Sequence, residues 1–180
     1  MSVFVKSLTV SEINRPEVLR YAGVKKPTPE IEDLLDSCIA ETKSTFTYRV
    51  CYTELKKDAL PKEISSLPFL DGYEKVIVFA ATVGLEIDRL VAKYGVMSPS
   101  RALILQSLGA ERIEALCDAF TSEFKTDSRR YSPGYGGFTI QNQGYIFSIL
   151  NPSRQIGLTL NSSLLMSPTK SVTAILPIKE

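Results

Sequence analysis

Histidine is absent from the 180 residues of this sequence. Catalytic triads, Cys-His nucleophiles and imidazole general bases all require that residue, so the chain cannot carry out those reactions by itself. Zinc or iron sites that depend on histidine ligands are excluded for the same reason. A cofactor that needs an axial histidine must therefore receive this ligand from another chain.

Cysteine is scarce, and its three copies are far apart. Cys38, Cys51 and Cys117 contain no Cys-x-x-Cys pair, and their odd number argues against a disulfide framework and favours a reducing compartment. Three thiols could in principle hold a metal cluster. We expect instead that they are small apolar core residues, with no metal bound.

Long apolar runs and an excess of charge are also missing. The longest apolar run, Val76–Val83, is far too short for a membrane span, and the N-terminus lacks the apolar region of a signal peptide. With 21 basic and 20 acidic residues, the net charge of +1 gives no reason to expect nucleic acid or a membrane as partner. We therefore predict a soluble, cytoplasmic protein.

The length predicts a single domain over residues 1–180, because 100–200 residues is roughly the size of one domain. Hydrophobic periodicity and the positions of Pro and Gly place helices between most of the strands, but the last third is rich in strands. This order predicts an α+β fold with a twisted, largely antiparallel sheet and packed helices. The predicted strands are 2–10, 46–55, 75–82, 155–160 and 171–178, and the predicted helices are 14–23, 27–39, 85–95, 98–124 and 141–150.

The most informative segment runs from Arg129 to Gly137 and reads Arg-Arg-Tyr-Ser-Pro-Gly-Tyr-Gly-Gly. Its glycines allow backbone conformations closed to other residues, and the loop exposes backbone groups. Arg130 supplies a forked cation for a carboxylate, while Tyr131 and Tyr135 supply aromatic faces. These groups suit a ligand with an anionic end, a flat base and a positive centre, such as S-adenosylmethionine. The same residues also fit an ordinary tight turn.

A longer pattern surrounds this segment. Arg130-Tyr-Ser-Pro-Gly134-Tyr135 resembles the Arg-x-x-x-Gly-Tyr motif of the reactivation domain of cobalamin-dependent methionine synthase, which binds S-adenosylmethionine. The helix at 141–150, the strand at 156–160 and the turn Met166-Ser-Pro-Thr-Lys-Ser171-Val172 are similar to the segments that follow the motif in that family. The resemblance covers most of the chain and is densest over 127–177. The apolar strand that ends at Gly84 and the long helix before the motif also look like those of stand-alone bacterial versions of the domain.

The resemblance also implies which residues bind the ligand. Arg130 would contact the carboxylate of S-adenosylmethionine, and Tyr135 would line the pocket. An acidic residue of the long helix would face the ligand's ammonium group; Glu114 is the candidate and Glu111 the alternative, and a solvated helix face is the other interpretation of either residue. The remaining contacts would come from the loop itself, at Tyr131, Ser132, Pro133 and Gly134.

The implied role is the repair of an oxidised corrinoid in methionine biosynthesis. The chain would hold the methyl donor while a partner protein carries the cobalamin and a flavodoxin-like protein supplies an electron. It would act as the activation component of a methyltransferase and, without catalytic side chains of its own, turn over nothing alone. Two alternatives remain: reactivation of a different corrinoid methyltransferase, and a non-catalytic docking subunit that kept the fold.

Overall fold

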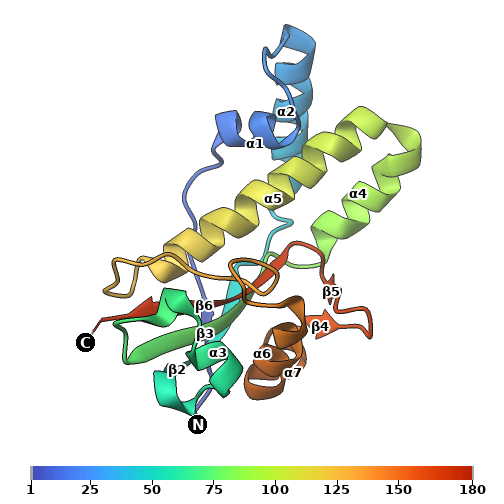
Figure 1. The fold of residues 1–180 in the computed structure, drawn as a ribbon. Coiled ribbons are helices and arrows are strands. Elements are labelled where there is room, and N and C mark those ends of the chain that lie inside the picture. The colour runs from blue at the N-terminus through green and yellow to red at the C-terminus, as the bar shows by residue number, and fades with distance from the viewer. Residues whose placement is uncertain (1, 180) are drawn as a thin grey trace.

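The computed structural model describes residues 2–179, and within them the main sheet has four strands (Figure 1). These are β1 (Phe4–Ser7), β2 (Arg49–Lys56), β3 (Lys75–Thr82) and β6 (Ser171–Ile178). Their order is β1-β2-β3-β6, and every neighbouring pair is antiparallel. The predicted α+β class and antiparallel sheet are confirmed. Two predicted strands are shorter than expected, since β1 covers only part of 2–10 and β2 begins at Arg49.

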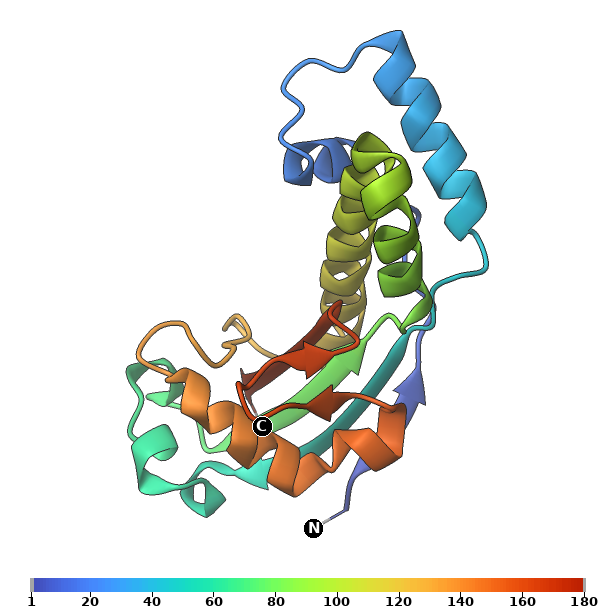
Figure 2. The same ribbon diagram turned by 90° about the vertical axis from the view of Figure 1, so that its right-hand side faces the viewer.

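One face of the sheet carries α4 (Glu86–Met97) and α5 (Pro99–Thr121), with α4 leading away from the sheet and α5 returning beside it and crossing above the strands (Figures 1 and 2). Pro16, Pro29 and Pro99 each lie in the first turn of a helix, where the missing N–H costs nothing. Apolar side chains of these helices and of the sheet form one core cluster. Two further helices, α1 (Arg15–Tyr21) and α2 (Pro29–Thr42), pack against the part of α5 that extends beyond the sheet (Figure 2).

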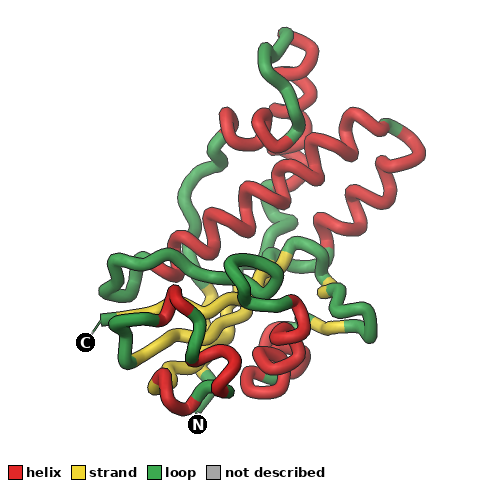
Figure 3. Tube along the Cα trace, in the orientation of Figure 1, coloured by secondary structure: helices red, strands yellow, loops and turns green. Residues whose placement is uncertain are grey.

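The opposite face carries short elements, which Figure 3 shows as small helices joined by long loops. Their apolar residues form a second core cluster against the sheet. These elements are η1 (Lys57–Ala59), α3 (Lys62–Ser65), η2 (Pro68–Leu70), η3 (Ile140–Asn142), α6 (Gln143–Leu150) and α7 (Pro152–Ile156). A two-stranded ribbon of β4 (Thr159–Leu160) and β5 (Met166–Ser167) follows them.

Strand β3 is the centre of this three-layer arrangement. Its residues from Val76 to Thr82 are all buried, as the continuous apolar run predicted. On β2 the side chains alternate, so Val50 belongs to the first cluster and Cys51 to the second. The sheet is therefore covered on both faces.

The predicted strand at 155–160 is wrong. Helix α7 occupies residues up to Ile156, and only Thr159 and Leu160 are in a strand. Pro152 lies in the first turn of α7, and Gly157 ends the helix with a φ of 74°. Helix α5 also ends at Thr121, earlier than predicted, because residues 122–124 form a turn after it.

All three cysteines are free and buried, as expected for core residues. Burial raises the pKa of both the Cys51 and the Cys117 thiol to about 12, so neither carries a thiolate at neutral pH. Within residues 2–179, none of the helices combines the length and the apolarity needed to span a membrane.

Gly109 of α5 provides the close approach that the Gly109-Ala110 step predicted. A Cβ atom added there would lie 2.9 Å from Lys170 Cγ and 3.2 Å from Ile87 Cγ1. Gly109→Val should therefore lower the free energy of unfolding by about 1–3 kcal/mol through overpacking, measured by urea denaturation. Gly95→Val is the matched control, because a Cβ at Gly95 of α4 meets nothing within 4 Å. Equal stability of the two variants would contradict this close packing.

Candidate functional site

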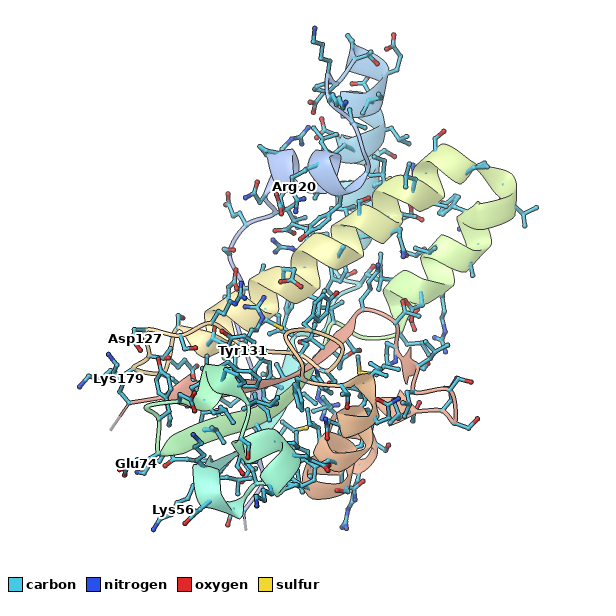
Figure 4. All side chains as sticks on the ribbon, viewed as in Figure 1. Arg20, Lys56, Glu74, Asp127, Tyr131 and Lys179 are labelled. Carbon is cyan, nitrogen blue, oxygen red and sulfur yellow. The ribbon has the colours of Figure 1, made fainter. Side chains whose placement is uncertain are left out.

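The segment from Lys125 to Tyr131 runs along the outer edge of β6. The Tyr131 N–H donates to the Ile175 carbonyl, and the Ile175 N–H donates back to the Tyr131 carbonyl, each over 2.9 Å. Further along, the Lys179 N–H donates to the Lys125 carbonyl over 2.9 Å. Tyr131 lies below the long helix in Figure 4. These bonds fix the start of the predicted ligand loop against the sheet.

The residues after Tyr131 form a tight turn. The Tyr135 N–H donates to the Ser132 carbonyl over 3.3 Å, and the Gly134 N–H donates to the Phe138 carbonyl over 2.6 Å. Gly134 has a φ of 101°, a backbone conformation in which a residue with a side chain would be strained. Within the turn, Pro133 is buried, whereas Tyr135 is 73% exposed. The motif therefore forms a tight turn and, at the same time, exposes the Tyr135 ring to a ligand.

Arg130 bridges the loop and the long helix. Its Nη2 donates to Glu114 Oε2, and its Nη1 donates to Asp118 Oδ1 over 2.6 Å. Only 20% of the Arg130 side chain is exposed. Although burial disfavours its charged form, the two carboxylates help keep the pKa of the Arg130 guanidinium above its ordinary value. The structure thus brings the two predicted ligand residues Arg130 and Glu114 together.

A cleft of about 320 Å³ opens beside this ion pair. The volume lies within the range of small-molecule sites. Most of the predicted site residues line the cleft; Pro133 and Gly134 do not, and both belong to the turn beside it. The lining residues are Glu114, Arg129, Arg130, Tyr131, Ser132, Tyr135 and Gly136.

Asp118, which pairs with Arg130, and Arg129, which lines the cleft, were not among the predicted site residues. A second cleft, of about 470 Å³, lies over the same helix face and includes both Glu114 and Asp118 together with Glu17 of α1. Residues four apart on a helix share one face, so the spacing of Glu114 and Asp118 was the signal that could have identified Asp118.

Glu111, the alternative to Glu114, has a different environment. Its carboxylate is buried and accepts from the Arg112 guanidinium, with Oε2 2.5 Å from Nε. It also accepts from the Asn14 N–H over 3.2 Å, and Arg112 Nη1 donates to the Ser11 carbonyl over 2.6 Å. Glu111 therefore holds the segment before α1 against α5, and Glu114 is the one of these two glutamates that faces the loop.

The two tyrosines of the motif differ in their contacts. The Tyr131 ring stacks on Phe69, with centroids 3.9 Å apart and an interplanar angle of 12°, and the Arg129 guanidinium lies 5.2 Å from the same ring. Tyr131 therefore forms part of the wall of the cleft. Tyr135 offers the more accessible aromatic face.

A larger cavity, of about 540 Å³, lies beside the β2–β3 end of the sheet. Figure 4 shows two of its residues, Lys56 and Glu74, well below Tyr131. Two of its lysines already have partners, since Lys57 Nζ donates to the Leu70 carbonyl over 2.8 Å and Lys75 pairs with Glu54. Its lining mixes opposite charges without the glycine-rich turn, so we place the candidate site at the smaller cleft.

Among solved structures, the fold has a counterpart in the crystal structure of the MetH reactivation domain bound to AdoHcy. The TM-score is 0.69, with 97% of this chain and 78% of that chain covered. Sequence identity is 13%, so the likeness shows a shared fold. No family model matches the chain, and no curated protein sequence matches it.

Proposed function

We propose that the chain binds S-adenosylmethionine in the Arg130 cleft and presents its methyl group to cobalamin held by a partner protein. The partner would be the cobalamin-binding part of a methionine synthase, and the net conversion is cob(II)alamin plus one electron and a methyl cation to methylcobalamin. A flavodoxin-like protein would supply the electron, and S-adenosylhomocysteine would leave as product.

One observation carries this proposal: the Arg130 loop and Glu114 border a single cleft in a fold shared with a domain crystallised with AdoHcy. The amino-acid end of S-adenosylmethionine is a zwitterion. Its carboxylate suits the Arg130 fork, and its ammonium suits the Glu114 carboxylate. The accessible ring of Tyr135 suits the flat base or the sulfonium centre.

The chain's own residues would bind and orient the donor rather than exchange protons with it. Arg130 and Glu114 would fix the amino-acid end, and the turn at 132–136 would border the nucleoside. Held in this way, the methyl group faces one direction, and positioning alone can supply much of the rate enhancement of a group transfer. The corrinoid supplies the nucleophilic metal centre and belongs to the partner chain.

The decisive experiment is a reconstitution. The cobalamin-loaded partner in its cob(II)alamin state is mixed with this chain, a one-electron donor and S-adenosylmethionine labelled in its methyl group. We expect the electron paramagnetic resonance signal of cob(II)alamin to decay and the label to appear on the corrinoid only when all components are present. Methylated corrinoid forming at the same rate without this chain would refute reactivation and favour the docking-subunit alternative. Activity with another corrinoid methyltransferase, but not with methionine synthase, would identify the partner as that protein.

Gly134 tests whether the shape of the turn matters for binding. Gly134→Ala places a side chain at a φ of 101°, which should cost roughly 1–2 kcal/mol and displace the turn. We expect a weaker dissociation constant for S-adenosylmethionine, measured by calorimetry. Gly144→Ala, at an open position in α6, should leave binding unchanged. Normal affinity of the Gly134 variant would show that the turn geometry is not needed for binding.

A further inference from the structure

We propose that Asp118 is an internal competitor for the ligand's carboxylate and thereby sets the affinity of the site for amino-acid-bearing ligands. This inference rests on the proposed binding of S-adenosylmethionine at Arg130. Asp118 belongs neither to the loop motif nor to the residues that line the 320 Å³ cleft. It nevertheless accepts a hydrogen bond from Arg130 Nη1, a donor that the ligand carboxylate would need.

The contact resembles the one that a bound carboxylate would make. Asp118 Oδ1 accepts from Arg130 Nη1 over 2.6 Å, the geometry of a charge-assisted bond between a guanidinium and a carboxylate. Arg130 itself is mostly covered, with 20% of its side chain exposed. A ligand carboxylate that approaches this covered cation must therefore share or replace an existing partner.

Of the two carboxylate partners of Arg130, Asp118 is the one that a ligand carboxylate would displace more easily. Its side chain is 72% exposed, against 46% for Glu114, so water can solvate the released carboxylate. Exposed ion pairs contribute little stability, and their loss costs correspondingly little. The carboxylates of Glu114 and Asp118 are also four residues apart on α5 and repel each other, which favours moving one of them away once a third carboxylate arrives.

The positions of the clefts separate the roles of these two acids. Glu114 lines the 320 Å³ cleft and the 470 Å³ cleft, so it remains in place to meet the ligand's ammonium group. Asp118 lines the 470 Å³ cleft and a third cleft of about 370 Å³, which Arg129 and Arg130 also line. No residue of the ligand loop lines the 470 Å³ cleft, so a displaced Asp118 side chain has open space there, on the side away from the loop.

The test compares two ligands that differ only at the amino-acid end. S-adenosylhomocysteine carries the carboxylate and ammonium, whereas 5′-methylthioadenosine keeps the nucleoside and thioether without them. We expect Asp118→Asn to tighten the dissociation constant for S-adenosylhomocysteine by about two- to fivefold, the range of an exposed ion pair. Binding of 5′-methylthioadenosine should stay unchanged. The gain should shrink at about 1 M salt, where exposed charges are screened.

Asp36→Asn is the matched control. Asp36 and Glu32 lie four residues apart on α2 and both pair with Arg15, which reproduces the arrangement of Asp118, Glu114 and Arg130 outside the site. This variant should bind both ligands as the unmodified chain does. A gain in affinity equal to that of Asp118→Asn would show a general effect of removing a negative charge and would overturn the inference.

The remaining outcomes separate the inference from the proposed function. If S-adenosylhomocysteine binds the unmodified chain and Asp118→Asn leaves its affinity unchanged or weakens it, Asp118 is not a competitor and the proposed function stands. Equal tightening of both ligands also overturns the inference. If neither ligand binds either protein, the proposed function fails, and the inference fails with it.

Discussion

Replacing Arg112 with methionine is expected to lower the free energy of unfolding by about 3–5 kcal/mol, because the substitution leaves the buried Glu111 carboxylate without its cation. Both side chains are at most 5% exposed, so water cannot substitute for the lost partner. The guanidinium also donates to the Ser11 and Glu12 carbonyls, which lose these bonds as well. Chemical denaturation monitored by circular dichroism measures the change.

A double variant distinguishes an unpaired charge from a general loss of packing. Replacing Glu111 with glutamine in the Arg112→Met background removes the uncompensated charge, so it should recover part of the stability. Arg20→Met, at a paired arginine exposed on α1, serves as the surface control and should change stability little. If Arg112→Met alone is as stable as this control, the Glu111–Arg112 pair does not hold the N-terminal segment in place.

Arg130→Ala should weaken the binding of S-adenosylmethionine by about 1.5–3 kcal/mol, which is roughly tenfold to somewhat over a hundredfold in the dissociation constant. The reason is that the proposed charge-assisted contact with the ligand carboxylate would be lost. The folded state should change by only about 1 kcal/mol or less, since both carboxylate partners of Arg130 are substantially exposed. Calorimetric titration and a thermal melt report the two effects separately.

Arg15→Ala provides the corresponding control, because Arg15 pairs with a glutamate and an aspartate in the same spacing on α2. Its ligand affinity should match that of the unmodified chain. If the Arg130 variant binds S-adenosylmethionine as well as the Arg15 variant does, Arg130 does not contact the ligand.

Local sequence patterns predicted most of the fold because those patterns report which faces are buried. The apolar run at 76–83, broken only by Thr82, predicted the central strand, and the helical spacing of Leu105, Leu108, Leu116 and Phe120 predicted the buried face of α5. The alternation Ile156-Gly-Leu158-Thr-Leu160 favoured a strand where the chain forms a helix end. There, Pro152 and Gly157 delimit a short helix, and the chemistry of these two positions outweighs the alternation.

The loop segment of the candidate site could be predicted from the sequence, but the contacts between residues distant in the chain could not. The loop motif could be identified from the sequence, and the resemblance that it carries pointed to one acidic residue on the preceding helix. Adjacent helix residues do not normally face each other, so the buried pairing of Glu111 with Arg112 follows only from the segment at 11–14 that packs across them. Likewise, the stacking of Tyr131 on Phe69 joins positions distant in sequence.

The two halves of the cleft belong to different layers of the molecule. The Arg130 loop is hydrogen-bonded to the edge of β6, whereas Glu114 and Asp118 project from α5. A ligand held by both Arg130 and Glu114 would therefore act as a cross-link between the helical layer and the sheet. Ligand binding and the docking of α5 on the sheet are then thermodynamically linked, so saturating ligand should slow amide hydrogen exchange along α5 as well as in the loop.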